Sequence, residues 1–456
     1  MAQPWMKYVI VVLIVGLVIG SGIGWAVKPV PPEYVAKTEL DKVNADLTKV
    51  KADLDKLRTD YNKLKADYDA LLKAGLTGEI LIGGLHPLTG DLATYGQNSK
   101  VAAEFAAEEI NALLKATGAK WTLKIVTEDT ETKPDVCLEK VKSLAAKGIK
   151  FMVGPMSSGE IRNIKGYCDA NKILTISQSS TAPALGVPGD FIFRFCPNDA
   201  WQGRAIARLL YADGIRYVVA AWRGDAWGDG LEDAAEKRFS ELGGNFTAKV
   251  RYAPEAKEFS AEAKALSDAV SSAVAKYGRD KVGVYFIAFE EVVIFFSACK
   301  EYTVLTEVKW YGSDGTVQSA AMLGDKAVAA FSVKTKFKNP IFTPVETAKF
   351  YKVRDKVKAV LGRVPDSYAY SAYDIVWALA YSLMTVDKYD SEAVRAVLPD
   401  VVKSLLGASG WVMLDANGDR APTDYDIWVI VETTPGVYDW KLISKWILDT
   451  DSIKWL

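Results

Sequence analysis

The sequence predicts an α/β protein with two lobes, each a doubly wound parallel sheet, joined by a hinge and preceded by a transmembrane helix and a coiled coil. Three observations support this fold class. An apolar run and a heptad repeat occupy most of the first 78 residues, short apolar strands alternate with helices from residue 79, and the alternation begins again after residue 194. Strands joined by helices form parallel sheets with helices on both faces, so two such series predict two lobes.

The composition is that of an ordinary globular protein and excludes several functions. The 456 residues are 50% hydrophobic and 25% charged, and 56 Lys and Arg nearly balance 57 Asp and Glu. Nucleic-acid-binding proteins show a basic surplus instead. A single histidine, His86, and four cysteines without C-x-x-C spacing favour neither a His-based metal site nor Ser-His-Asp catalysis. Since a P-loop and a nucleophile elbow are also absent from the sequence, we expect a protein that is not an enzyme and has no cofactor.

Residues 8–27, YVIVVLIVGLVIGSGIGWAV, form a run of 20 residues without a charge. As a helix this run is about 30 Å long, which matches the hydrocarbon core of a membrane. We expect an uncleaved single-pass anchor, and a cleaved signal peptide is the alternative. Residues 1–7, with Lys7, would be a short cytoplasmic tail. The globular part would then lie outside the cytoplasm, in the periplasm or at the cell surface.

Residues 33–73 carry a heptad repeat, with an apolar residue at every a and d position over five heptads. The a positions are Leu40, Leu47, Leu54, Tyr61 and Tyr68, and the d positions are Val43, Val50, Leu57, Leu64 and Leu71. Acidic residues at g precede basic residues at e of the next heptad, the pattern that pairs parallel chains. We expect a parallel coiled-coil stalk of roughly 50 Å that makes a homo-oligomer of unspecified chain number. A lone amphipathic helix packed on a domain is the alternative.

The globular elements follow in order. In the first half we expect strands at 80–85, 121–129, 149–154 and 173–177, and helices at 98–114, 137–147 and 158–170. In the second half we expect strands at 216–222, 246–252, 282–289 and 308–314, and helices at 201–211, 230–242, 259–277 and 290–301. Helices at 346–361, 371–384 and 391–406 precede a closing β meander that contains 411–419 and 426–432.

The two lobes are expected to exchange chain segments. Lobe 1 would comprise 79–196 and 334–411, and lobe 2 would comprise 197–333 and 412–456. Three crossovers near 196, 333 and 411 would then form the hinge. In open α/β sheets ligands bind beyond the carboxyl ends of the strands, so the loops there are the candidate site.

Two loops of the first half carry hydroxyl groups. Residues 154–159 (GPMSSG) and 178–183 (QSSTAP) each follow a strand and are expected to open a helix. A helix start offers backbone N–H groups and a positive dipole end, which suit a carboxylate or another anion. Simple N-capping by Ser and Thr is the alternative.

The loops of the second half carry aromatic and acidic residues. They are 222–227 (WRGDAW), 289–291 (FEE) and 313–315 (SDG). A carboxylate such as Asp314, placed across a cleft from the anion loops, would complete a receptor for a zwitterion. The alternative for Asp314 is an ordinary Asp-Gly turn.

The region 79–456 resembles the type I periplasmic (solute) binding proteins of ABC importers, in the branched-chain amino acid (leucine/isoleucine/valine-binding) family. The segments that carry the resemblance are IGGLHPLTGDLATYG, GIKFMVGPMSSG, ILTISQSSTAPAL, FIFRFCPNDAWQG and WYGSDG, in this order. The resemblance implies that Ser158 binds the ligand carboxylate, that Ser179 offers backbone groups and that Thr181 offers its hydroxyl. It implies that Asp314 holds the ammonium group, and that Tyr95, Trp227 and Phe289 are the pocket aromatics.

The function that the resemblance implies is capture of an amino acid by closure of the two lobes and its delivery to an ABC permease. A ligand-sensing receptor and a structural surface protein on the same fold are the alternatives. Phe289 and Trp227 stand where the family often has Tyr, which puts leucine-like specificity in doubt.

Three further residues receive an interpretation. Arg223 is interpreted as a solvated surface residue rather than a ligand contact, and Asp415 as part of a β-turn rather than a calcium loop. Asn245 begins an N-glycosylation sequon.

Overall fold

The computed structural model describes residues 37–73 and 75–456, which belong to two separate units, a single helix and a globular region. The predicted cytoplasmic tail at 1–7 and membrane anchor at 8–27 lie outside the described residues. Within the part of the chain that is described, no helix is both long enough and apolar enough to cross a membrane.

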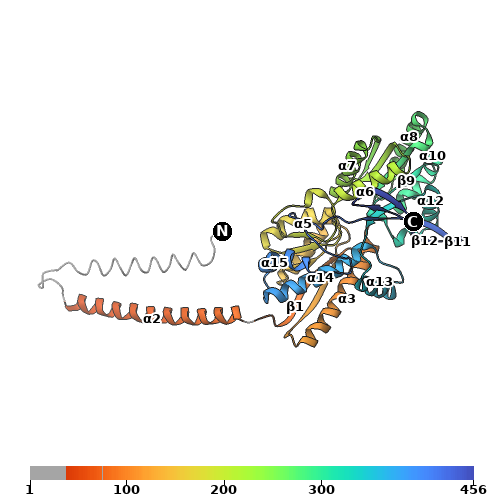
Figure 1. Ribbon diagram of the computed structural model, residues 1–456. Helices are drawn as coiled ribbons and strands as arrows, with labels where there is room; N and C mark the ends of the chain where they lie inside the picture. The colour runs from red at the N-terminus through yellow and green to blue at the C-terminus, as the bar shows by residue number, and fades with distance from the viewer. Residues whose placement is uncertain (1–36, 74) are drawn as a thin grey trace. The chain divides into compact units, whose positions relative to one another are not determined.

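Helix α2, Lys37–Lys73, coincides with most of the predicted heptad segment (Figure 1). Its 37 residues extend over about 55 Å at 1.5 Å per residue. Its apolar heptad side chains are 46–62% exposed, namely Val43, Leu47, Val50, Leu54, Leu57, Tyr61 and Leu64. Such a row gains free energy when a partner helix covers it. The helix therefore agrees with the sequence prediction, whereas its pairing with another chain stays a prediction.

Lobe 1 is built on a five-stranded parallel sheet of order β2-β1-β3-β4-β5. The strands are β1 Gly78–His86, β2 Trp121–Asp129, β3 Phe151–Val153, β4 Leu174–Ser177 and β5 Ile192–Arg194. Successive residues of β3 point to opposite faces, since Phe151 and Val153 belong to one core cluster and Met152 to another. Helices cover both faces, as the sequence predicted.

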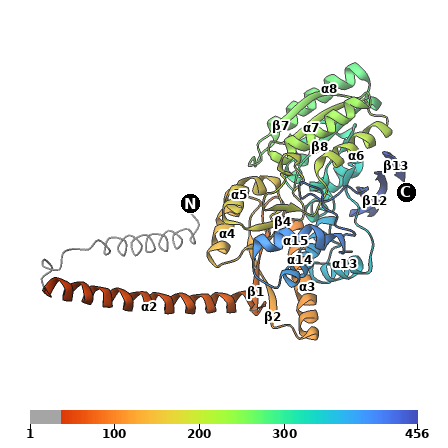
Figure 2. The same ribbon diagram turned by 60° about the vertical axis from the view of Figure 1, so that its left-hand side comes forward.

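One face of the lobe 1 sheet is covered by helices that are far apart in the sequence. They are α3 Ala93–Thr117, α13 Ala348–Leu361, α14 Ser367–Val386 and α15 Ser391–Lys403. The other face is covered by α4 Pro134–Ala146 and α5 Ser158–Asn171. Figures 1 and 2 show the blue α14 beside the orange α3, so the chain returns to lobe 1 after passing through lobe 2.

Lobe 2 is built on a four-stranded parallel sheet of order β7-β6-β8-β9. The strands are β6 Tyr217–Arg223, β7 Asn245–Tyr252, β8 Val282–Ile287 and β9 Lys309–Tyr311. Helices α6 Asp199–Ala212 and α7 Ala226–Glu241 pack on one face. The other helices are α8 Ser260–Tyr277, α9 Val292–Cys299, α10 Thr303–Thr306, α11 Ala320–Gly324 and α12 Lys326–Thr335.

A third, antiparallel sheet of order β10-β11-β12-β13 ends the fold. Its strands are β10 Asn339–Phe342, β11 Tyr425–Thr434, β12 Val437–Ile447 and β13 Ser452–Trp455. The sequence predicted a closing meander but missed β10. It also placed 411–419 in the meander, whereas these residues form only isolated bridges, because the chain turns sharply at Asp415.

Two of the chain segments that link the lobes, at Arg194 and at residues 418–420, are joined by hydrogen bonds and an ion pair. The backbone N–H of Arg194 donates to Gly418 O and its backbone oxygen accepts from Arg420 N, both at 2.9 Å. Its guanidinium forms a buried two-pronged ion pair with Asp419. Breaking such a pair leaves one buried charge without its partner, which costs about 3–5 kcal/mol. This ion pair therefore joins β5 to the segment before β11.

The structure also describes the turn at Asp415, the cysteines and the sequon at Asn245. Asp415 accepts hydrogen bonds from Asn417 N and Asp419 N, the geometry of a tight turn. In residues 37–73 and 75–456, no group of three His, Cys, Asp or Glu side chains is placed to hold a metal ion. The four cysteines are buried free thiols. Asn245 is exposed at the start of β7, and its glycosylation stays a prediction.

Candidate ligand-binding cleft

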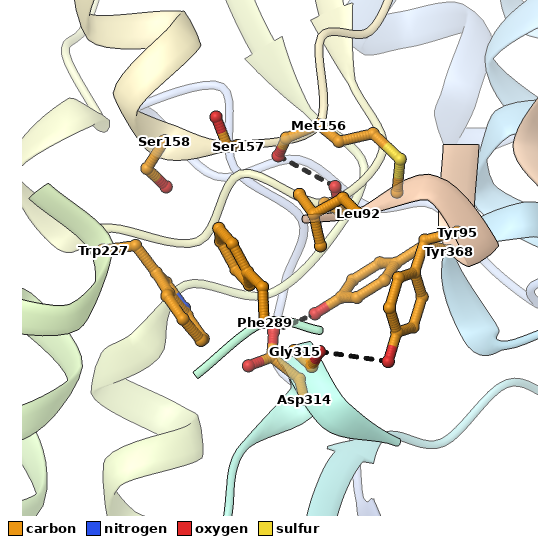
Figure 3. A pocket seen from close by; sticks show the side chains of 11 residues that line it. Leu92, Tyr95, Met156, Ser157, Ser158, Trp227, Phe289, Asp314, Gly315 and Tyr368 are labelled. Carbon is orange, nitrogen blue, oxygen red and sulfur yellow. Dashed lines mark hydrogen bonds between the residues drawn. The ribbon is translucent and has the colours of Figure 1, made fainter. Parts of the chain in front are cut away.

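Six of the seven site residues predicted from the sequence line one cavity between the lobes (Figure 3). These are Tyr95, Ser158, Ser179, Trp227, Phe289 and Asp314, and the other lining residues are Leu92, Met156, Ser157, Gly315 and Tyr368. Most come from loops that follow parallel strands, where open α/β sheets bind ligands. Thr181 is buried near the cavity but does not line it.

The first wall is the N-terminus of α5. Ser157 caps the helix, because its hydroxyl accepts from Glu160 N at 3.2 Å and its N–H donates to the Glu160 carboxylate at 2.9 Å. The cap leaves the hydroxyl of Ser158, the first helical residue, at the cavity. That hydroxyl lies 3.0 Å from Ser180 Oγ and accepts from Ala182 N at 3.2 Å.

The second hydroxyl loop continues the same wall. Ser179 Oγ donates to Met156 O at 2.9 Å, which ties this loop to the first one. The sequence predicted that a helix begins after this loop. Only the three-residue 3₁₀ helix η1, Pro183–Leu185, follows it, because Thr181 O is instead used by Asp199 N at the start of α6. Of the two hydroxyl loops, only the first therefore opens an α-helix whose dipole could favour an anion.

The opposite wall holds a pair of buried carboxylates. Asp314 begins the 3₁₀ helix η3, Asp314–Thr316, after β9, and its carboxylate accepts a hydrogen bond from Tyr368 OH. Gln202 links it to Asp199, since Gln202 Oε1 accepts from Asp314 N at 2.9 Å and Gln202 Nε2 donates to Asp199 Oδ1 at 3.0 Å. Asp199 is fully buried and Asp314 is 4% exposed.

Burial makes the ionised forms of this pair costly. It raises the pKa of Asp314, against the opposing hydrogen bonds from Tyr368 and Gln202. Burial, and then the neighbouring Asp314 charge, raise the pKa of Asp199 well above its ordinary value. Within the described part of the chain, Asp199 Oδ2 and Asp314 Oδ1 receive no hydrogen bond. A cationic group between the lobes would stabilise both.

The side of the cavity is closed by two stacked aromatic rings. Trp227 and Phe289 lie 4.4 Å apart between ring centroids, at an interplanar angle of 16°. The Arg223 guanidinium lies over the Phe289 ring, 4.2 Å from its centroid. The sequence interpretation of Arg223 as a solvated surface residue was wrong. Arg223 is 4% exposed because Glu291 and Asp225 each hold its guanidinium at 2.7 Å.

The two lobes touch each other around the cavity. Tyr95 OH donates to Gly315 O at 3.1 Å inside the cleft. At the rim, Thr94 Oγ1 donates to Glu290 Oε1 at 2.6 Å, and Glu290 N donates to Asp91 O at 3.0 Å. We call the contacts of Asp91, Thr94 and Glu290 the rim contact. They place the cleft in a closed state with a cavity volume of about 20 Å³.

Sequence reasoning missed Asp199, Gln202 and Tyr368. Asp199 and Gln202 lie in the first turn of α6, which follows β5, and Tyr368 lies in the first turn of α14, so none of them follows a strand that the sequence predicted. The available signal was the run of polar residues in CPNDAWQG directly after the predicted crossover near 196.

The family described as periplasmic binding protein matches residues 79–431. An uncharacterised protein of Methanocaldococcus jannaschii is 36% identical over 82% of this chain and 91% of its own length. The Leu/Ile/Val-binding protein BraC3 of Rhizobium johnstonii is 30% identical over 40% of this chain and half of its own length.

A solved structure gives the same assignment for the fold. The branched-chain amino acid transporter substrate-binding protein LivJ of Streptococcus pneumoniae, in complex with isoleucine, superposes with a TM-score of 0.65 at 18% identity. The match covers 80% of this chain and 99% of that one. The chain therefore belongs to the periplasmic binding protein family, and it shares the two-lobed fold of this solved structure.

Proposed function

We propose that this protein is the extracytoplasmic solute-binding component of an ABC importer, and that it captures an amino acid by closing its two lobes. One observation carries the proposal. The hydroxyl of Ser158 at a helix N-terminus and the buried carboxylate of Asp314, which Gln202 links to Asp199, meet at the same cavity from opposite lobes. A zwitterion is the ligand whose two ends match these two walls.

In the proposed mechanism, lobe 1 binds first. The ligand carboxylate would lie at the N-terminus of α5, beside the Ser158 and Ser179 hydroxyls, where the helix dipole is favourable. The ligand ammonium would meet Asp314 and Asp199 only when lobe 2 closes over it. Because a ligand shifts a conformational equilibrium by its difference in affinity for the two states, this contact would favour the closed form. The closed form would then dock on the permease.

We further propose that the chain is tethered and oligomeric. The charge-free run at 8–27 supports a single-pass anchor in the cell membrane, with the globular part in the periplasm or at the cell surface. The exposed apolar row of α2 supports a homo-oligomeric coiled coil. Sedimentation of the full chain in detergent would test the stalk, and a monomer at micromolar concentration would contradict it.

Isothermal titration calorimetry of the detergent-solubilised full chain against the 20 common amino acids tests the binding role. We expect saturable binding of at least one amino acid, and no heat with any of them would contradict the proposal. Import needs a second experiment. Uptake of the radiolabelled ligand should fall in a strain that lacks the gene and return on complementation. Unchanged uptake would favour a sensing or structural role.

A further inference from the structure

We infer that the ligand is an amino acid with a small side chain, such as glycine, alanine or serine, rather than leucine or isoleucine. The inference rests on the proposed function and concerns the residues that set the size of the side-chain space. The stacked rings of Trp227 and Phe289 are the specificity-determining wall. This differs from what the names of the relatives alone suggest.

The distance between the lobes is set by hydrogen bonds of the protein itself across the cleft. Tyr95 OH reaches Gly315 O, and Glu290 N reaches Asp91 O, both across the cleft. Glu290 also accepts hydrogen bonds from Thr94 Oγ1 and Ser319 Oγ, each at 2.6 Å. A bulkier ligand that separates the lobes would lose these hydrogen bonds. Full closure therefore limits the ligand to the space that remains between the walls.

The aromatic wall of Trp227 and Phe289 is supported by Arg223. Phe289 lies between the Trp227 ring and the Arg223 guanidinium, and ion pairs with Glu291 and Asp225 fix that guanidinium. Figure 3 shows the Trp227 and Phe289 side chains next to each other, with Gly315 close to both. A Cβ atom at Gly315 would lie 2.8 Å from both rings, so the rings pack directly on this glycine backbone. Because Gly315 and the Arg223 guanidinium lie against the two rings, the rings cannot move away from a ligand side chain.

The space that remains for a ligand in the closed cleft is small. The cavity volume between the walls is only about 20 Å³. Leu92 and Met156 form the rest of the apolar lining and are 5% and 2% exposed. Methionine adapts its shape easily, so small shifts of Met156 would admit a hydrogen or a methyl group. A branched four-carbon side chain would have to overpack the cavity or displace the stack.

The two polar ends of the site bind groups that every amino acid shares. Discrimination therefore depends on the side-chain space alone, where one methylene in a tight apolar pocket changes affinity by about 10- to 200-fold. The test is calorimetry of the full chain in detergent with glycine, L-alanine, L-serine, L-valine, L-leucine and benzoate. We expect glycine, alanine or serine to bind at least about tenfold more tightly than leucine. Leucine or benzoate as the tightest ligand, or leucine within about twofold of alanine, would overturn the inference.

Variants that enlarge the space sharpen the test. Met156→Ala should raise the affinity for leucine relative to alanine by about fivefold or more, and Leu92→Ala provides a second route if Met156→Ala does not fold. Val360→Ala, at an exposed position of α13, is the matched control and should leave the ratio unchanged. An unchanged ratio in both cavity variants would also overturn the inference. Absence of binding by every amino acid would instead contradict the proposed function itself.

Discussion

The two walls of the cleft differ in how their polar groups are satisfied. On lobe 1, the Ser158 hydroxyl contacts Ser180 and Ala182, and the Ser179 hydroxyl donates to Met156 O. On lobe 2, Asp199 and Asp314 each keep one buried carboxylate oxygen to which no described residue donates. The hydroxyl groups of the first wall find hydrogen-bond partners within their own lobe, whereas each carboxylate of the second wall keeps one oxygen without a described donor.

This difference assigns unequal tasks to the lobes. The lobe 1 wall keeps its geometry without a ligand, so it can bind a carboxylate with little reorganisation. The lobe 2 carboxylates lack a counter-charge, so their ionised forms are unfavourable until a cation arrives. Most of the binding free energy should therefore be lost when the lobe 2 acid is changed, and less when a lobe 1 hydroxyl is changed.

The largest expected effect is at Asp314. Asp314→Asn keeps the shape of the side chain and removes its charge. We expect the Kd for the amino acid ligand to rise about 100-fold or more, because a buried ammonium that loses its charged partner costs ~2–5 kcal/mol. Calorimetry of the full chain measures this. Asp280→Asn, at an exposed position of the same lobe, is the control and should bind like wild type. A Kd within about threefold of wild type in Asp314→Asn would remove this residue from the site.

The next effect is on stability in the ligand-free state. The pKa of Asp314 is raised in the folded protein, so between the unfolded value near 4 and the raised value the unfolded chain binds fewer protons. Stability from this group is therefore highest at low pH and falls as the pH rises through that window. The stability of Asp314→Asn relative to wild type should therefore be greater at about pH 7.5 than at about pH 4.5. Urea denaturation at both pH values measures the difference, and a difference that does not change with pH would contradict the raised pKa.

A smaller effect is expected on lobe 1. Ser158→Ala removes one hydroxyl and leaves the N-terminus of α5 in place. The Kd should rise about tenfold, because a hydrogen bond to a charged group contributes ~1.5 kcal/mol or more. Ser272→Ala, an exposed serine of α8, is the matched control. If Ser158→Ala weakened binding as much as Asp314→Asn, the proposed inequality of the two walls would be wrong.

The smallest expected effect is at the rim contact, outside both walls. Glu290→Ala removes the hydrogen bonds from Thr94 and Ser319 but touches no ligand-facing atom. We expect the Kd to rise only about 3- to 10-fold, through a less stable closed state. Glu301→Ala, an exposed glutamate, is the control for charge. An unchanged Kd in Glu290→Ala would show that closure does not depend on the rim contact.

Local pattern was enough to predict most strands, most helices and the loops that line the cleft, but not β5 or β10. Six of the predicted site residues meet in one cavity because parallel strands bring their carboxyl ends to one edge of the sheet. Asp199 and Tyr368 were missed because Asp199 follows β5, a strand that the sequence did not predict, and Tyr368 follows a segment between two helices. Their approach to Asp314 depends on how the crossovers are arranged, which no short-range periodicity encodes.

The burial of Arg223 could not be predicted from its local sequence either. An arginine in a polar loop is normally solvated, and nothing in WRGDAW indicates otherwise. In the structure Glu291, which is 68 residues further along the chain, accepts from its guanidinium and buries it behind Phe289. Burial of a charge is decided by the position of its partner, and here that partner follows a different strand.

The sequence by itself determined the two parallel sheets, the helical heptad segment and the chemical character of each wall of the cleft. These are properties of neighbouring residues, since side-chain periodicity and strand-end position are local. Tertiary structure alone decided that two carboxylates share one buried site, that Arg223 supports the aromatic wall and that about 20 Å³ is left for a ligand. Those facts depend on distances between segments that only the closed arrangement of the two lobes brings together.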